Sequence, residues 1–211
     1  MRGLYLVTDR GLCGNRSLED VAHQALAGGA VCIQLREKDV STRVFMEEAR
    51  KMKALTARFR VPLIINDRID VALASGADGV HLGQDDMLYD EARRLMGPKA
   101  IIGLSVETWD DVVEAEALDV NYLGVSPVFE TPTKTNTRGN WGFAGLARIK
   151  AYSRHMLVAI GGMNASNAKE AVMAGADCIA VVSAICAASD PLLVSRKINA
   201  IIQAALKKRA A

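Results

Sequence analysis

The chain has 211 residues, half of them hydrophobic, with a mean hydropathy of +0.12 and a formal net charge of +2 at neutral pH. This composition can bury a large core, so we expect one domain over residues 1–211, and the scattered charge argues against nucleic-acid binding. No apolar stretch reaches the ~20 residues of a membrane helix and no signal-peptide pattern is present, so we expect a cytoplasmic protein that does not bind membranes.

Eight short apolar runs recur along the chain, and a stretch with apolar residues at helical spacing follows each of them. In chain order the runs lie at residues 4–8, 31–35, 62–66, 79–83, 100–106, 122–128, 157–162 and 178–185. Strict alternation of strand and helix implies parallel strands joined by right-handed crossovers. Eight such units, with no GxGxxG after the first, predict an α/β protein with a closed (β/α)8 TIM barrel instead of an open doubly wound sheet.

The second predicted strand continues into the polar segment "IQLREKD". Period two places Gln34, Arg36 and Lys38 on one face, at the end of the barrel where active sites of this fold lie. Two cations and an amide there suit an anionic ligand. The alternative is a solvated strand end whose cations pair with the neighbouring Glu37 or Asp39.

Acidic side chains follow the third and fourth predicted strands. Asp67 comes after Asn66 in "IINDR", and Asp85 and Asp86 lie in "GQDD". Carboxylates on neighbouring strand ends suit Mg²⁺, which proteins commonly hold by one or two carboxylates plus substrate phosphates. Helix capping is the alternative, because Asp is a preferred N-cap and each of these residues precedes a predicted helix.

The last two strand ends have the features of a phosphate site. Gly161 and Gly162 in "AIGGMNAS" precede a helix start, and Ser183 ends the eighth predicted strand. Backbone amides at such positions hold phosphates, and barrels of this kind often have a phosphate site there. A glycine pair before a helix could also be only a tight turn.

One long loop, "FETPTKTNTRGNWG" at residues 129–142, has no periodicity, and loops of this length are usually functional or disordered. It carries hydroxyls at Thr131 and Thr133 and a cation at Lys134. With the two regions described above, the chain can bind two anionic groups. We therefore expect two small phosphorylated substrates, or one substrate phosphorylated at both ends.

Histidines and cysteines add little to this prediction. His81 lies in register to face the barrel lumen, as a core histidine or a substrate contact, whereas His23 and His155 fall on helical stretches and are expected at the surface. The four cysteines form no CxxC pair, which predicts reduced, buried thiols. No Ser/His/Asp or Cys/His arrangement supports covalent catalysis.

Taken together, "LYLVTD", "IQLREKD", "INDR", "ADGVHLGQDD", "IIGLSV", "YLGVSPVFETPTKTNT", "AIGGM" and "VVSAI" resemble the thiamin phosphate synthase family over essentially the whole chain. The resemblance implies a (β/α)8 enzyme that joins a hydroxymethylpyrimidine diphosphate to a thiazole phosphate and releases diphosphate and thiamin phosphate, with one Mg²⁺ ion per subunit. In that chemistry diphosphate departs, and the thiazole nitrogen captures the pyrimidine methylene cation. A homo-oligomer is compatible with this pattern, and the sequence does not define one.

The resemblance also implies a set of site residues. The pyrimidine diphosphate would be bound by Gln34, Leu35, Arg36, Glu37, Lys38, Asn66, Ser105 and Lys134; the thiazole phosphate by Thr131, Pro132, Thr133, Gly162, Val182 and Ser183; and Mg²⁺ by Asp67 and Asp86. His81 and Arg68 would support these groups; Arg68 stands where an acidic residue is expected, and it could pair with a neighbour or reach a phosphate. The alternatives are a thiazole tautomerase-like isomerase, a sugar-phosphate isomerase and a non-catalytic phosphate-binding barrel.

Overall fold

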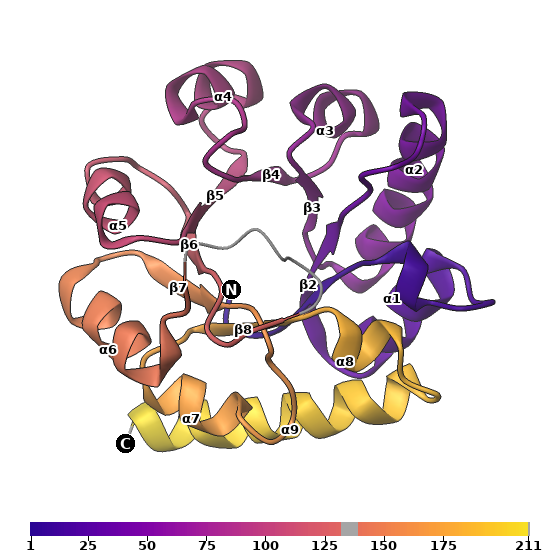
Figure 1. Cartoon of the computed structure of the whole chain (residues 1–211). Coiled ribbons are helices and arrows are strands. Elements are labelled where there is room, and N and C mark those ends of the chain that lie inside the picture. Colours follow the sequence, from indigo (N-terminus) through magenta and orange to yellow (C-terminus); the bar gives the residue numbers. More distant parts are fainter. Residues whose placement is uncertain (132–138, 211) are drawn as a thin grey trace.

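The computed structural model describes residues 1–131 and 139–210, in which eight parallel strands close into a barrel. Figure 1 looks along this barrel, and each strand pairs with the next until β8 returns to β1. The predicted (β/α)8 fold is thereby confirmed. The strands are β1 (Gly3–Val7), β2 (Ala30–Leu35), β3 (Leu63–Asn66), β4 (Gly79–Leu82), β5 (Ile101–Val106), β6 (Tyr122–Val125), β7 (Met156–Ala159) and β8 (Cys178–Val181).

Helices surround the barrel on the outside, as Figure 1 shows. They are the 3-10 helix η1 (Arg10–Leu12) and the α-helices α1 (Leu18–Ala27), α2 (Thr42–Phe59), α3 (Ile69–Ser75), α4 (Tyr89–Met96), α5 (Trp109–Glu116), α6 (Gly142–Tyr152), α7 (Ala168–Met173), α8 (Ser183–Cys186) and α9 (Pro191–Ala210). The last helix packs on α1 and α7 and completes the ring. Among the described helices, none combines the length and the apolar character that crossing a bilayer requires.

Three apolar runs extend at least three residues beyond the end of their strand. The run at 157–162 is strand only to Ala159, and the Gly161–Gly162 turn follows it. The run at 178–185 is strand only to Val181, and the short helix α8 follows it. Ile185, the last residue of the run, and Cys186 after it pack into the core as part of this helix, which periodicity cannot distinguish from a strand over so few residues. The run at 122–128 is strand only to Val125, because Pro127 lacks the N–H that a strand ladder needs.

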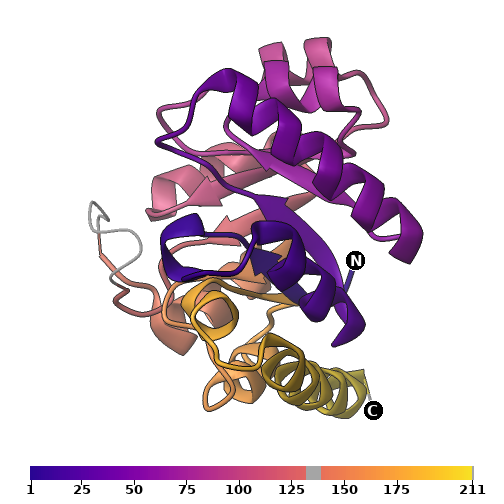
Figure 2. The ribbon, with the colours of Figure 1, turned by 90° about the vertical axis from the view of Figure 1, so that its right-hand side faces the viewer.

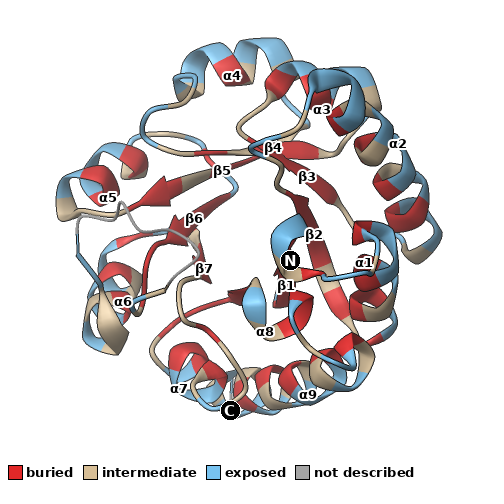
Figure 3. Ribbon diagram, turned by 45° about the vertical axis from the view of Figure 1, so that its right-hand side comes forward, coloured by how far each residue is buried: buried red, intermediate tan, exposed pale blue. Residues whose placement is uncertain are grey.

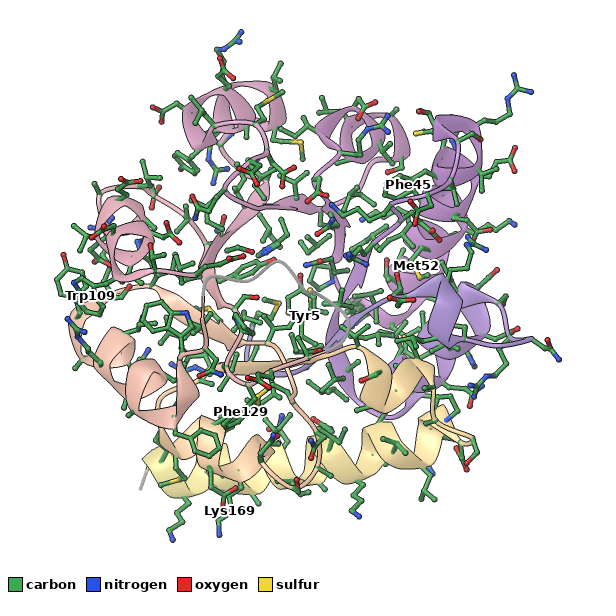
Figure 4. The ribbon with its side chains drawn as sticks, in the orientation of Figure 1. Tyr5, Phe45, Met52, Trp109, Phe129 and Lys169 are labelled. Atoms are coloured by element: carbon green, nitrogen blue, oxygen red, sulfur yellow. The ribbon has the colours of Figure 1, made fainter. Side chains whose placement is uncertain are left out.

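The barrel separates two apolar regions, and Figure 3 shows the buried residues concentrated on the strands and the inner helix faces. Leu4 and Leu6 point outward to the core between strands and helices, and Tyr5 and Val7 point into the lumen. In Figure 4 the labelled Phe45 and Met52 are buried side chains of α2. Because side chains fill the lumen, ligands can enter only at the barrel ends.

At the end of the barrel where the strands begin, the buried Asp177 pairs with partly exposed cations, and both termini lie on this side in Figure 2. Asp177 accepts hydrogen bonds from Lys150 at 3.1 Å, Arg209 at 2.9 Å and the Leu157 amide at 3.1 Å. Burial alone would raise the pKa of Asp177, but the hydrogen bonds from the Leu157 amide and Lys150 hold it below its ordinary value. This carboxylate therefore ties α6 and α9 to β7.

Two histidines and the four cysteines test the expectations about burial. His155 is buried at the start of β7, with its Nε2 3.8 Å from Glu116, so its predicted surface position is wrong. The helix that precedes it ends at Tyr152, and the chain turns inward before His155. His23 is exposed on α1 as expected, and all four cysteines are free and buried, which confirms that prediction.

Candidate active site

A cavity of about 450 Å³ opens at the ends of the strands, and every strand or the loop after it contributes to its lining. Its base lies inside the barrel, where the labelled Tyr5 is seen in Figure 4. Of the residues expected to bind ligands or metal, the lining includes Gln34, Arg36, Lys38, Asn66, Asp67, Asp86, Ser105, Thr131, Gly162, Val182 and Ser183. The fold thus brings side chains from distant parts of the chain to one cavity.

A chain of hydrogen bonds forms the base of the cavity. The Tyr5 hydroxyl lies 2.9 Å from the Tyr122 hydroxyl and accepts from Gln34 at 3.0 Å. His81 joins them, with Nδ1 3.1 Å from the Tyr122 hydroxyl and Nε2 2.9 Å from Ser105 Oγ. Burial raises the pKa of both tyrosines well above the ordinary value, so both hydroxyls keep their protons. The two tyrosines therefore give the base polar, uncharged hydroxyls.

Sequence reasoning missed the two tyrosines, although a signal was present. Tyr5 alternates with the outward-facing Leu4 and Leu6, so period two alone places it in the lumen. Tyr122 fits because Gly103 faces it from β5: a Cβ at Gly103 would lie 2.1 Å from the Tyr122 ring. His81 faces the lumen as predicted, stacks on Tyr122 and lines the cavity.

The two expected cations both line the cavity, and their partners differ from those considered in the solvated-end alternative. Lys38 forms an ion pair with Asp67, and Arg36 Nη1 lies 3.8 Å from Asp9 Oδ2. Glu37 instead binds Arg10, at 2.8 and 3.0 Å. The alternative in which Glu37 or Asp39 neutralises these cations is therefore wrong, because the partners come from other strands.

Two described residues expected to bind the pyrimidine diphosphate are absent from the cavity lining. The Leu35 side chain is fully buried in the core between strands and helices. The Glu37 side chain is only 5% exposed and turns toward Arg10. Both follow from the alternation along β2, which sends every second side chain away from the lumen.

The two expected metal ligands lie beside each other. Asp67 has a positive φ of 62° and donates its N–H to His81 O, and Asp86 accepts from the Gly83 amide at 2.7 Å. Burial and the adjacent carboxyl of Asp67 raise the pKa of Asp86, and the hydrogen bond from the Gly83 amide and the charge of Lys38 offset this only in part. The capping alternative is wrong, because α3 and α4 begin at other N-caps, without any side-chain cap.

This pair of carboxylates fits a divalent cation. Within residues 1–131 and 139–210, no group of three or more His, Cys, Asp and Glu side chains is placed to bind a metal. Mg²⁺ does not require one, because one or two carboxylates usually suffice when a substrate phosphate and waters complete the shell. Burial is the main reason for the raised pKa of Asp86, and the carboxyl of Asp67 adds to it; a cation bound between the two would favour the charged carboxylates.

Across the cavity from these charges lies a turn made by Gly161 and Gly162. Both have positive φ, 99° and 64°. Neither position has room for a side chain: a Cβ on Gly162 would lie 2.9 Å from Phe129 Cβ, and one on Gly161 would lie 2.5 Å from Pro127 Cβ. The Gly162 carbonyl accepts from the side chains of Asn164 and Asn167, which fixes the turn.

The start of α8 lines the same cavity as the glycine turn, with Val182 as the N-cap of this helix and Ser183 as its first residue. Turns after the seventh and eighth strands, with a short extra helix, are a recurrent phosphate site in barrels. Thr131 also lines the cavity. The expected site residues Pro132, Thr133 and Lys134 lie outside the described residues.

Arg68 points away from the cavity. Its guanidinium donates to Asp70 at 2.8 and 2.5 Å and to the Thr42 hydroxyl at 3.1 Å. The sequence allowed Arg68 either to pair with a neighbour or to reach a phosphate, and in the structure it pairs with Asp70. Gln84 lines the cavity although the sequence pattern did not predict it there. Its side chain donates to Ser105 O at 2.6 Å, which ties the loop of Asp86 to β5.

A closed (β/α)8 barrel with paired cations and carboxylates at one side of its mouth, and a glycine turn at the other, is typical of barrel enzymes with a site for anionic ligands. Comparison with known proteins makes this more specific. The family model described as thiamine monophosphate synthase matches residues 4–185. The chain belongs to this family and is accordingly an enzyme, a transferase of thiamine biosynthesis.

Individual relatives agree with this assignment. The chain is 53% identical to the thiamine-phosphate synthase of Albidiferax ferrireducens, over 95% of this chain and 92% of that protein. It is 54% identical to the thiamine-phosphate synthase of Leptospira biflexa, over 90% of this chain and 93% of that protein. Among solved structures, it is similar to thiamine phosphate pyrophosphorylase from Pyrococcus furiosus, with a TM-score of 0.89 and 37% identity over 97% and 96% of the two chains.

Proposed function

We propose that the chain couples 4-amino-2-methyl-5-hydroxymethylpyrimidine diphosphate with 4-methyl-5-(2-phosphoethyl)thiazole to give thiamin phosphate and diphosphate. One observation carries this proposal: Arg36, Lys38, Asp67 and Asp86 meet at one side of a cavity whose other side holds the Gly161–Gly162 turn. The first side suits a diphosphate with a cation, and the second suits a single phosphate. The relatives are named thiamine-phosphate synthases, which supports thiamin phosphate as the product.

The pyrimidine diphosphate would lie over the polar base of the cavity. Gln34 and Ser105 offer donors and acceptors to a heteroaromatic ring, and Asn66, 7% exposed, adds an amide beside them. Arg36 and Lys38 at the rim then face the diphosphate, as does Lys134 on the sequence argument alone. These cations neutralise the group that has to leave.

Asp67 and Asp86 would hold Mg²⁺ next to the diphosphate. When bound, this ion supplies Lewis-acid neutralisation of the leaving oxygens. The protein's own contribution is to keep the two carboxylates together, with Asp86 fixed by the Gly83 amide and Asp67 by its N–H bond to β4.

The thiazole phosphate would be bound at the opposite side. Gly162, Val182 and Ser183 present backbone and hydroxyl groups there, and Thr131 closes the cavity beside them. Pro132 and Thr133 belong to the same expected set. Because the two phosphate sites lie on opposite sides of one cavity, the reacting ends of the substrates meet between them.

The bond between the methylene carbon and the diphosphate oxygen breaks first, and the electron pair leaves with diphosphate. The methylene cation that remains is stabilised by the pyrimidine, and the lone pair of the thiazole nitrogen forms the new C–N bond. No proton moves in this step, so the site needs no strong base. It needs preorganised positive charge, and each such contact is worth about 3 kcal/mol by analogy with oxyanion holes. Arg36 and Lys38 supply that charge.

The test is release of diphosphate from the pyrimidine diphosphate, with and without thiazole phosphate, as Mg²⁺ is titrated. We expect release that requires both Mg²⁺ and the second substrate. An isomerase or a non-catalytic barrel would release none, and that result would overturn the proposal. Binding of Mn²⁺ followed by electron paramagnetic resonance, compared between the unmodified chain and Asp86→Asn, tests the metal site independently of activity.

A further inference from the structure

Three residues directly after β1 bind two residues directly after β2. Thr8 is fully buried, and its Oγ1 accepts from the Arg36 N–H at 3.0 Å. Asp9 Oδ2 lies 3.8 Å from Arg36 Nη1. Arg10 donates to Glu37 Oε1 through both Nε and Nη2, at 3.0 and 2.8 Å. The loop that carries the rim cations is therefore held by its neighbour, residue by residue.

Asp9 is itself fixed before it meets Arg36. Its Oδ1 accepts from the Leu12 amide at 3.3 Å at the start of η1, and its carbonyl accepts from the Cys13 thiol at 3.2 Å. The other carboxylate oxygen faces Arg36. A flexible arginine next to a fixed carboxylate samples fewer rotamers, so the guanidinium is oriented in advance.

The separation of 3.8 Å between Asp9 and Arg36 suits this role. It is short enough for attraction between opposite charges and too long for a hydrogen bond. The N–H groups of Arg36 are then oriented by Asp9 without being used by it, so they remain available to an anionic ligand. A bidentate Arg–Asp pair would compete with that ligand instead.

Glu37 acts from outside the cavity. Its side chain is 5% exposed and held by Arg10, whose Nη2 also lies 3.9 Å from Glu48 of α2. Glu37 stands between Arg36 and Lys38 in the chain, so the Arg10 contact fixes the backbone that carries both cations. This gives Glu37 a structural reason to be part of the expected diphosphate segment although it does not reach the cavity.

We propose that Asp9 and Arg10 are positioning residues for the diphosphate-binding cations, Asp9 through the Arg36 guanidinium and Arg10 through Glu37. The inference rests on the proposed function, because it assumes that these cations bind the leaving diphosphate. Thr8 completes the arrangement by fixing the Arg36 backbone.

The experiment is a double-mutant cycle on the full chain, with diphosphate release as the readout. Asp9→Asn keeps an oxygen for the Leu12 amide and removes the charge that faces Arg36. We expect it to lower kcat/KM for the pyrimidine diphosphate on the order of 10- to 100-fold in the native background. In an Arg36→Met background we expect a loss within about twofold, and the KM for thiazole phosphate should stay unchanged in both.

Asp190→Asn is the matched control, because Asp190 also accepts from a helix-start amide, that of Leu193 at 2.9 Å, and lies outside the site. Its small effect should be the same in both backgrounds. Equal losses from Asp9→Asn with and without Arg36, or a loss no larger than that of the control, would overturn the inference.

Arg10→Met and Glu37→Gln form a second cycle, which decides the question if Asp9→Asn does not fold. Each substitution should lower kcat/KM for the pyrimidine diphosphate. The double variant should be no less active than the less active of the two single variants, and additive losses would count against the proposal. If the unmodified chain releases no diphosphate, the proposed function fails, and this inference fails with it. Turnover by the unmodified chain with additive losses overturns the inference alone.

Discussion

Gly162→Ala should weaken thiazole phosphate binding specifically. The residue has a φ of 64°, where alanine costs about 1–2 kcal/mol, and the added methyl would lie 2.9 Å from Phe129 Cβ and 3.1 Å from Glu130 O. Moving the turn to relieve this contact misplaces the amides that face the ligand. A hydrogen bond to a charged group is worth about 1.5–3 kcal/mol, which corresponds to roughly a 10- to 150-fold rise in KM for thiazole phosphate.

Gly76→Ala is the matched control for this variant. Gly76 has a φ of 68° at the end of α3, and a methyl there would meet nothing within 4 Å. In both variants alanine has to adopt left-handed backbone, which destabilises the fold. Only Gly162→Ala adds a steric clash, which should lower the free energy of unfolding in urea by about a further 1–3 kcal/mol. Steady-state kinetics with each substrate varied in turn separates the two sites. An equal rise in KM for both substrates, or the same kinetics in both variants, would refute a phosphate site at Gly162.

Two further predictions concern the charged groups. Lys38→Ala should reduce kcat roughly 100-fold and leave the KM for thiazole phosphate within about twofold, because Lys38 stabilises the leaving group; equal effects on both parameters would contradict this. Asp177→Asn should lower stability by about 1–3 kcal/mol at pH 7 in urea unfolding, since the cations around it are partly exposed. Because folding lowers the pKa of Asp177, its contribution to stability is complete above the unfolded pKa of about 4 and disappears as pH falls through the folded pKa. The stability curves of the unmodified chain and Asp177→Asn should therefore converge in acid. A constant gap between the two curves would contradict this.

The fold could be read from the sequence because each strand carries its own signal. Residues 63–65 of β3, for example, are buried on both faces of the sheet and are all apolar, and the helices between the strands show a separate period. Period two also placed Gln34, Arg36 and Lys38 correctly at the cavity. These are local properties, and local sequence is sufficient to define them.

The partners of the site residues could not be read in this way. Whether Asp67 caps α3 or faces the cavity depends on a backbone with φ of 62° that is fixed by a hydrogen bond to β4. Arg10 and Glu37 are 27 residues apart and meet only because β1 and β2 are adjacent in the barrel. His155 was misplaced for a related reason, since the turn after α6 decides its burial. Each of these depends on the tertiary structure.

The charges at the cavity mouth are balanced in a way that couples the two expected ligands. Lys38 contacts Asp67, and Asp67 lies beside Asp86, so the lysine offsets part of the negative charge of the carboxylates. If Lys38 turns to a diphosphate, Asp67 and Asp86 lose that compensation and favour a cation more strongly. If the carboxylates instead bind a cation first, Lys38 is released toward an anion. By linkage the two effects are equal, so diphosphate and metal should each strengthen the binding of the other through this one lysine.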